Sequence, residues 1–273
     1  MITIFTIPKP FTEPHIKIIQ QNAIKSWALL NPKCEFFLVG NDEGATETAK
    51  QLGIKNLPNV EKNEFGTPLL NSAFNLARTN STNDIIVYLN CDIILTSNFI
   101  GAVNRLPQKN FLAVGRRWDL DIRDIINFKN PAWEMDIKKE IKKRGVLHSY
   151  AGIDYFIFEK NSFKNMPPLI VGRVGWDNYM ILKARNKKMK VIDATEAITA
   201  IHQNHDYPNF NKGRERKTNP EAKKNSSFIK SVPYTFTIED TNYKLTKNEL
   251  KRKFFYWIPF VKRYIKYKIN SNP

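Results

Sequence analysis

The chain has 273 residues, of which 42% are hydrophobic and 12% aromatic, so it can build a folded core and is neither a disordered nor a fibrous chain. Its 43 Lys and Arg against 26 Asp and Glu give a net charge of +17, which indicates an anionic partner: nucleic acid, a phosphorylated ligand or an acidic membrane surface. No segment approaches the ~18 apolar residues of a membrane span, and two cysteines without secreted-type spacing favour a reducing compartment. We therefore expect a cytoplasmic protein, soluble or peripheral on a membrane.

Apolar runs of strand length alternate with amphipathic stretches from the first residue to about residue 205. The first strand is expected at 2–7, followed by a helix that Thr12 would cap, with Pro14 in its first turn. Further strands are predicted at 35–39, 84–89, 111–115, 154–158 and 189–192, and further helices would end at Gly53, begin with Thr67 as N-cap and cover 176–184. This alternation indicates a mainly parallel sheet flanked by helices, which binds ligands beyond the carboxyl ends of its strands.

The run 84–89, DIIVYL, has no polar alternation and predicts a central strand buried on both faces. It brings Asn90-Cys91-Asp92 to its carboxyl end. Asp92 could hold a divalent ion that neutralises a diphosphate, and Asn90 would point the same way if the extended geometry continues. The alternative for the same residues is an ordinary polar turn before the next helix.

Eight short motifs follow one another along the chain: TIPKPF at 6–11, GNDEG at 40–44, NEFGTPLL at 63–70, NCD at 90–92, GRRWD at 115–119, AGIDYF at 151–156, GWDN at 175–178 and IHQNHDY at 201–207. Their order and spacing resemble those of the GT-A glycosyltransferases, in particular the family-2-like nucleotide-diphospho-sugar transferases. The NCD motif is similar to the Asp-x-Asp motif, with an amide in place of the first carboxylate. The resemblance implies a GT-A, Rossmann-like catalytic domain at 1–205, with a nucleotide-sugar half at about 1–115 and an acceptor half at about 116–205.

The resemblance also implies a ligand set, namely a nucleoside-diphosphate sugar, UDP- or GDP-linked, as donor and a glycan or lipid-linked acceptor. The residues that it implies for the nucleotide-sugar site are Thr6, Pro8, Lys9, Asp42, Thr67, Asn71, Asn90, Cys91, Asp92 and Arg117. Plain structural roles are the alternatives for several of them, such as helix capping for Thr67 and a solvated surface arginine for Arg117.

A divalent metal, Mn²⁺ or Mg²⁺, is implied on Asp92 and on a histidine of a late loop. His202 and His205, two of only four histidines, both lie in that segment, and the sequence does not choose between them. Imidazole, carboxylate and diphosphate oxygens together suit Mn²⁺ better than Mg²⁺. A solvated or hydrogen-bonded loop histidine is the alternative.

Inverting glycosyl transfer needs a carboxylate that takes the proton of the acceptor hydroxyl. Asp177 is the first candidate for this base, because it stands where the family carries its acidic motif; Asp154 is the second and Asp119 the third. Asp177 could equally be only a helix N-cap. A retaining relative could share the entire nucleotide half, so the stereochemistry stays open.

The composition changes beyond residue 205. Residues 206–243, rich in Asn, Lys, Glu, Ser and Pro, predict a loop or flap, and 244–273 form a basic, aromatic, helical extension with nine Lys or Arg against one Glu, a net charge of +8. Its aromatic and aliphatic run at 254–261 suits the anionic cytoplasmic face of a membrane. A helix that docks on the catalytic domain or on a second subunit is the alternative.

Two interpretations of another class remain: a nucleic-acid-binding protein, and an inactive sugar-nucleotide-binding scaffold, which Asn90 would permit. The terminal position of the basic cluster and the carboxylates of the implied metal site argue against nucleic acid. We therefore expect a metal-dependent glycosyltransferase that helps build a surface glycan and has no nucleic-acid partner.

Overall fold

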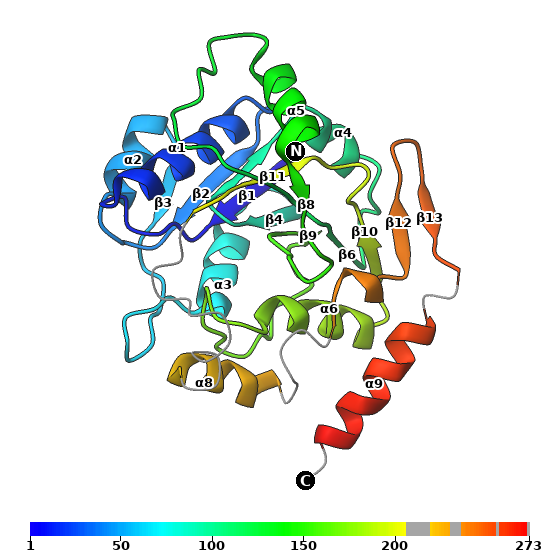
Figure 1. Cartoon of the computed structure of the whole chain (residues 1–273). Coiled ribbons are helices and arrows are strands. Elements are labelled where there is room, and N and C mark those ends of the chain that lie inside the picture. Colours follow the sequence, from blue (N-terminus) through cyan, green and yellow to red (C-terminus); the bar gives the residue numbers. More distant parts are fainter. Residues whose placement is uncertain (206–218, 230–235, 255–256, 272–273) are drawn as a thin grey trace.

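A nine-stranded sheet runs through the described residues, which are 1–205, 219–229, 236–254 and 257–271 of a computed structural model (Figure 1). Its strands are β1 (Ile2–Thr6), β2 (Glu35–Val39), β3 (Lys55–Leu57), β4 (Ile85–Leu89), β6 (Phe111–Val114), β9 (Tyr155–Glu159), β10 (Lys190–Asp193), β12 (Tyr243–Leu245) and β13 (Leu250–Arg252). They lie in the order β13-β12-β10-β6-β9-β4-β1-β2-β3. Most neighbours are parallel, while β9 runs antiparallel between β4 and β6 and β13 runs antiparallel at the edge. The predicted mainly parallel α/β sheet is confirmed.

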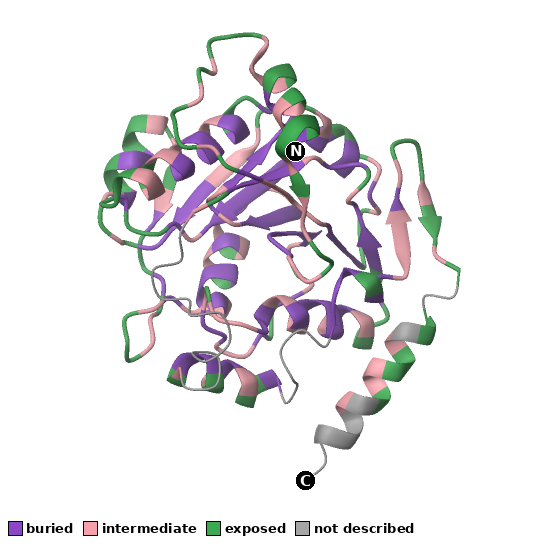
Figure 2. Ribbon diagram, in the orientation of Figure 1, coloured by how far each residue is buried: buried purple, intermediate pink, exposed green. Residues whose placement is uncertain are grey.

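Helices cover both faces of this sheet (Figure 1). They are α1 (Pro14–Ala28), α2 (Ala45–Leu52), α3 (Leu70–Asn80), α4 (Asn98–Val103), α5 (Trp133–Arg144), α6 (Trp176–Asn186), α8 (Pro220–Ile229), the 3-10 turn η1 (Ile238–Asp240) and α9 (Trp257–Ser271). On one face α1, α2 and α4 share a core with Ile4, and on the other α3 and α6 share a core with Phe5. Because successive strand residues point to opposite faces, both β1 and β4 are fully buried (Figure 2). The buried strand predicted at 84–89 is confirmed for 85–89, while Asp84 is exposed.

Aromatic rings fill the core between the sheet and α3. Phe74 of α3 meets the ring of Phe5 edge-on at 5.1 Å and stacks on Phe158 at 5.4 Å between centroids. Tyr88 of β4 packs edge-on against Trp176, the first residue of α6, at 5.3 Å. These contacts hold the carboxyl end of β4 and the start of α6 in a fixed relation, because interdigitated rings leave little room for either element to shift.

A second, four-stranded sheet lies beside the first, in the order β5-β11-β7-β8. Its strands are β5 (Ile93–Leu95), β11 (Ala200–Gln203), β7 (Trp118–Leu120) and β8 (Val146–Leu147), and α5 covers it with Ile137 and Ile141. β11 pairs antiparallel with β5 and parallel with β7. This sheet was not predicted, because strands of two to four residues give almost no periodic signal in the sequence.

Two helices begin at other residues than predicted. Glu13, not Thr12, caps α1, because its carboxylate accepts hydrogen bonds from the backbone N–H groups of His15 and Ile16 at 3.1 and 2.5 Å. Thr67 does not cap α3, which starts at Leu70. The two residues before that start are extended: Pro68 bridges to Lys62, and Leu69 bridges to Ile170.

The main sheet crosses the boundary predicted at residue 205. β12 pairs in parallel with β10, and β13 returns antiparallel to it, so residues 243–252 belong to the sheet. In the segment predicted as a loop, α8 and η1 are helical, while 206–218 and 230–235 lie outside the described residues. Composition cannot reveal a strand as short as β12, whose partner β10 lies some fifty residues earlier. Among the described residues, no helix is long and apolar enough to cross a membrane.

We expect Phe74→Ala to destabilise the fold by about 3–5 kcal/mol. The substitution removes a buried ring that contacts aromatic rings of the three strands β1, β4 and β9. Urea unfolding followed by circular dichroism measures this free energy. Phe254→Ala is the matched control, since that ring is 91% exposed and its removal should change stability by less than about 0.5 kcal/mol. Equal losses in both variants would contradict the prediction.

Candidate functional site

A pocket of about 1390 Å³ lies where the carboxyl ends of β1 and β4 meet the second sheet. Most of the predicted site residues line it: Pro8, Lys9, Asp42, Thr67, Asn90, Cys91, Asp92, Arg117, Asp119, Asp154, Asp177, His202 and His205. Two do not. Thr6 is fully buried at the end of β1, and Asn71 lies in the first turn of α3. The pocket therefore gathers side chains from motifs spread over about 200 residues of the chain.

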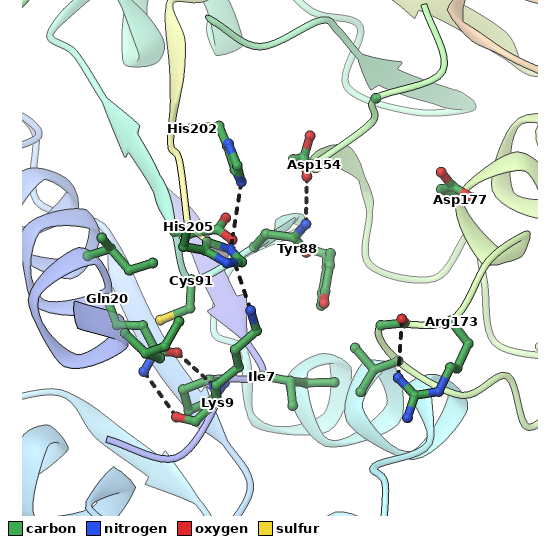
Figure 3. Close-up of a pocket in the computed structure, with 18 of the residues that line it drawn as sticks. Ile7, Lys9, Gln20, Tyr88, Cys91, Asp154, Arg173, Asp177, His202 and His205 are labelled. Carbon is green, nitrogen blue, oxygen red and sulfur yellow. Dashed lines mark hydrogen bonds and ion pairs between the residues drawn. The ribbon is translucent and has the colours of Figure 1, made fainter. Parts of the chain in front are cut away.

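Three side chains form a compact cluster, and Figure 3 shows two of them, His202 and His205, on the same side of the pocket. Asp92, His202 and His205 each offer a ligand atom, and these atoms all lie within 4.8 Å of one another. Asp92 Oδ2 is 3.2 Å from Nε2 of His205 and 3.7 Å from Nε2 of His202. The cluster forms because β11 pairs with β5 so that His202 stands opposite Ile93, next to Asp92. His202 therefore lies in a buried strand and not in the predicted loop.

Asp119 of β7 supports this cluster from behind. Its carboxylate is 3.2 Å from Nδ1 of His202, 2.6 Å from Nδ1 of His148 and 2.9 Å from Nε of Arg117. The parallel register of β7 and β11 sets His202 opposite Asp119. A carboxylate on the far nitrogen of a histidine fixes the ring and makes its other nitrogen a better metal ligand. Asp119 thus fits a positioning role rather than that of the base.

The charges of this wall stabilise its carboxylates in the ionised form. Burial alone would raise the pKa of Asp92, but His202, His205 and Lys9 lower it below its ordinary value. Burial works against the charge of His202 as well, yet Asp92 and Asp119 raise the pKa of this imidazole overall. Burial lowers the pKa of Lys9, whose Nζ lies 3.4 Å from Nε2 of His205.

Three buried polar atoms of the cluster have no hydrogen-bond partner within the described part of the chain: Oδ1 of Asp92 and both ring nitrogens of His202, of which Nδ1 faces Asp119 at 3.2 Å. An unpaired buried polar group costs about 1–3 kcal/mol, so a site that leaves Oδ1 of Asp92 and Nε2 of His202 together is built for a further ligand. One carboxylate and two imidazoles are a donor set for a transition metal such as Mn²⁺. The residues present therefore fit the implied metal, and both histidines can serve it.

Asn90 and Asp92 face different partners, although they line the same pocket. The chain turns after Asn90, whose carbonyl accepts a hydrogen bond from the N–H of Ile93 at 3.2 Å, so the extended geometry does not continue. Asn90 Nδ2 donates to Oδ1 of Asp154 at 2.8 Å, and Arg117 Nη1 contacts both oxygens of Asp154 at 2.6 Å. The carboxylate of Asp154 is thus held on two sides.

Asp177 lies across the pocket from the two histidines (Figure 3). It is the second residue of α6, and Gly175 is the N-cap, with a φ of 99° that favours glycine. The half-buried carboxylate accepts a hydrogen bond from the N–H of Asn178 at 2.9 Å. Burial and the nearby charge of Asp154 outweigh such bonds and raise the pKa of Asp177 to about 6. Its proton can therefore be exchanged close to neutral pH.

A buried acid from the C-terminal part of the chain holds the pocket rim. Glu221 of α8 accepts hydrogen bonds from Asn63 Nδ2 and Arg173 Nε, both at 2.7 Å, and from the side chain of Thr67. Arg173 lines the pocket (Figure 3). Neither Arg173 nor Glu221 was predicted as a site residue, and no local pattern could have connected them, since 48 positions separate the pair. His148 was also missed; its only signal was the rarity of histidine in this chain.

No known sequence family matches the chain, and no curated protein matches its sequence. Solved structures do match. GalNAc-T7 with UDP, GalNAc and Mn²⁺ superimposes with a TM-score of 0.52 and 13% identity, over 84% of this chain and 48% of that one. The chain has a GT-A fold. It spans about half the length of GalNAc-T7.

Two further structures overlay with TM-scores of 0.49. The mannosyltransferase PcManGT from Pyrobaculum calidifontis, with GDP-Man and Mn²⁺, is 10% identical over 76% of this chain and 58% of that one. Glucosyl-3-phosphoglycerate synthase from Mycobacterium tuberculosis, with Mn²⁺, UDP and phosphoglyceric acid, is 12% identical over 84% of this GT-A chain and 77% of that one.

We expect the protein to bind Mn²⁺ in solution, and Asp92→Asn to weaken this binding at least ~10-fold, because an amide supplies no negative charge to the ion. Electron paramagnetic resonance of free Mn²⁺ measures the affinity. Asp42→Asn makes the same chemical change in the same pocket outside the cluster and should leave the affinity unchanged. Asp92→Asn binding as tightly as the wild type would contradict this assignment.

Proposed function

We propose that this protein is a metal-dependent glycosyltransferase, which moves a sugar from a UDP- or GDP-sugar to a hydroxyl of a glycan or lipid-linked acceptor with inversion. One observation carries the proposal: the pocket places a cluster of Asp92, His202 and His205 on one wall and Asp177 on the opposite wall. The GT-A fold supports it, since ligands of open α/β sheets bind at the carboxyl ends of the strands.

The donor would lie along the ends of β1 and β4. Lys9 stands beside the cluster, where its ammonium can meet a phosphate oxygen. Asp42 accepts a hydrogen bond from Lys62 at 2.6 Å, which leaves the second carboxylate oxygen for the base or ribose. Thr67 contributes to the same rim, held by Glu221. These residues would bind and orient the nucleotide.

The metal would be held by Asp92, His202 and His205, with Asp119 fixing the ring of His202. When bound, a divalent cation offsets the negative charge that builds up on a departing diphosphate. The chain's own contribution is a rigid ligand set: His202 is anchored in β11, and the backbone carbonyl of Asp92 accepts a hydrogen bond from Gln203 Nε2 at 3.1 Å.

Asp177 would act as the base. Its carboxylate takes the proton of the acceptor hydroxyl while that oxygen forms a bond to the anomeric carbon, and the bond from that carbon to the diphosphate breaks on the opposite side. Asp154 is the weaker candidate, because Arg117 and Asn90 already occupy its oxygens. A retaining enzyme of the same fold is the alternative, and the anomeric configuration of the product, read by nuclear magnetic resonance, separates the two.

A thermal-shift screen tests donor binding. We expect UDP or GDP to raise the melting temperature in the presence of Mn²⁺, and to raise it less without Mn²⁺, because a ligand that binds only the folded state stabilises it. Asp92→Asn should lose the metal-dependent part of the shift. The absence of any shift with either nucleotide would overturn the proposed function.

Asp177→Asn should lower turnover by about 10²- to 10⁴-fold, because an amide cannot accept the proton. Release of nucleoside diphosphate during slow transfer to water measures this rate without a known acceptor. The wild-type rate should fall as the pH drops through about 6, where Asp177 becomes protonated. Asp121→Asn, an exposed substitution, is the control and should retain the full rate and the same pH profile.

The Asp177→Asn variant should be more stable than the wild type at pH 7.5. The folded-state pKa of about 6 lies above the ordinary 3.8, so the stabilisation from this proton is fully present below about pH 3.8 and is lost as the pH rises through 6. Asn carries no charge, so we expect Asp177→Asn to gain about 1–3 kcal/mol at pH 7.5 and little at pH 4. A variant that is inactive and also less stable would point to a structural role for Asp177.

A further inference from the structure

The C-terminal helix α9 carries two apolar faces, and only one of them is docked. Phe260, Tyr264 and Tyr267 pack against the core beneath α6. Phe236 lies 5.8 Å from the rings of both Phe260 and Tyr267. These positions are three and four residues apart, so they share one side of the helix. One face of α9 therefore docks on the domain that carries the pocket. Docking of this kind was the alternative to membrane contact that the sequence left open.

Charged side chains fix the orientation of α9 on the domain. Arg263 Nη1 contacts Asp240 Oδ2 at 2.6 Å, and its other amino group contacts Glu239, both in η1. The guanidinium of Arg185, on α6, lies 4.2 Å from the ring centre of Phe260. With this face held, the opposite side of α9 cannot rotate into the core.

The second apolar face of α9 points to solvent at the periphery of the molecule (Figures 1 and 2). Trp257 and Ile265 are each 54% exposed, and Ile258 and Val261 between them are exposed as well. The spacing of Trp257, Ile258, Val261 and Ile265 again follows one side of a helix. A strip of four large exposed apolar side chains on a protein surface marks an interaction site.

The charge around this strip selects the partner. The last 30 residues carry a net charge of +8, and the exposed Lys262 lies on α9 next to the strip. A second copy of the chain would bring a second Lys262 to the same strip, and like charges repel. An anionic bilayer satisfies both features, since its interface takes Trp and Ile side chains while its phosphates pair with Lys and Arg.

We propose that α9 binds this protein to anionic lipid bilayers by lying in the plane of the interface, with the strip of Trp257, Ile258, Val261 and Ile265 inserted. Fifteen residues of helix measure about 22 Å, shorter than the ~30 Å hydrocarbon core, so α9 lies on the membrane and does not cross it. This inference does not depend on the proposed function, because it concerns a surface outside the pocket.

Vesicle sedimentation of the full chain tests the proposal. We expect the protein to sediment with vesicles of phosphatidylcholine mixed with phosphatidylglycerol, and at least ~10-fold less with phosphatidylcholine alone. The double variant Ile258→Ser and Ile265→Ser should lose at least ~10-fold in binding to the anionic vesicles. Lys262→Glu should weaken the same binding by about 10-fold.

Met135→Ser is the matched control, because Met135 on α5 is 54% exposed, the same fraction as Ile265, and should leave vesicle binding unchanged. Circular dichroism and donor turnover of the double variant should equal those of the wild type, which separates membrane binding from folding and catalysis. Wild-type protein that stays in solution with anionic vesicles would overturn the proposal. So would a dimer in analytical ultracentrifugation that the double variant abolishes, since the strip would then be covered by a second copy.

Discussion

The pairing of β11 with both β5 and β7 is the constraint on which the candidate site depends. Its register sets His202 opposite Ile93, beside Asp92, and opposite Asp119. A shift by one residue would turn the imidazole to the other face of the sheet, away from the half-buried carboxylates of Asp92 and Asp119. Main-chain hydrogen bonds between these strands thus decide which side chains surround His202. Ile94 and Ile201 of the same sheet pack against α5, which holds the strands in this register.

The pocket divides its carboxylates by environment. Asp92 and Asp119 lie among histidines, Lys9 and Arg117, which keep them ionised, whereas Asp177 is half buried with Asp154 as its charged neighbour, which favours its protonated form. Groups of one chemical type can therefore serve as metal ligand, support and base in one cavity. Asp177 lowers the free energy of unfolding when it is ionised, because its raised pKa means that the folded protein favours the protonated carboxyl group.

The large positive charge of the chain has no single explanation. Arg117 is neutralised inside the pocket by Asp119 and Asp154, and Arg263 by η1, so these cations hold the structure together. The excess in the last 30 residues accompanies an apolar strip that the domain leaves uncovered. Lys262 and the exposed apolar strip lie together on α9, a combination that neither a nucleic acid nor a second basic subunit would match as well as a lipid interface.

The sequence by itself determined the mainly parallel sheet, the burial of 85–89 and the presence of Asp92 just beyond the carboxyl end of that strand, because local periodicity and a long apolar run carry that information. Its motifs also predicted that His202, His205 and Asp177 belong to one site. Only the tertiary structure decided that both histidines approach Asp92, that Asp119 stands behind them and that Glu221 holds Arg173. These relations depend on pairing between short strands and on contacts across 48 to 113 residues of chain, which no local pattern records.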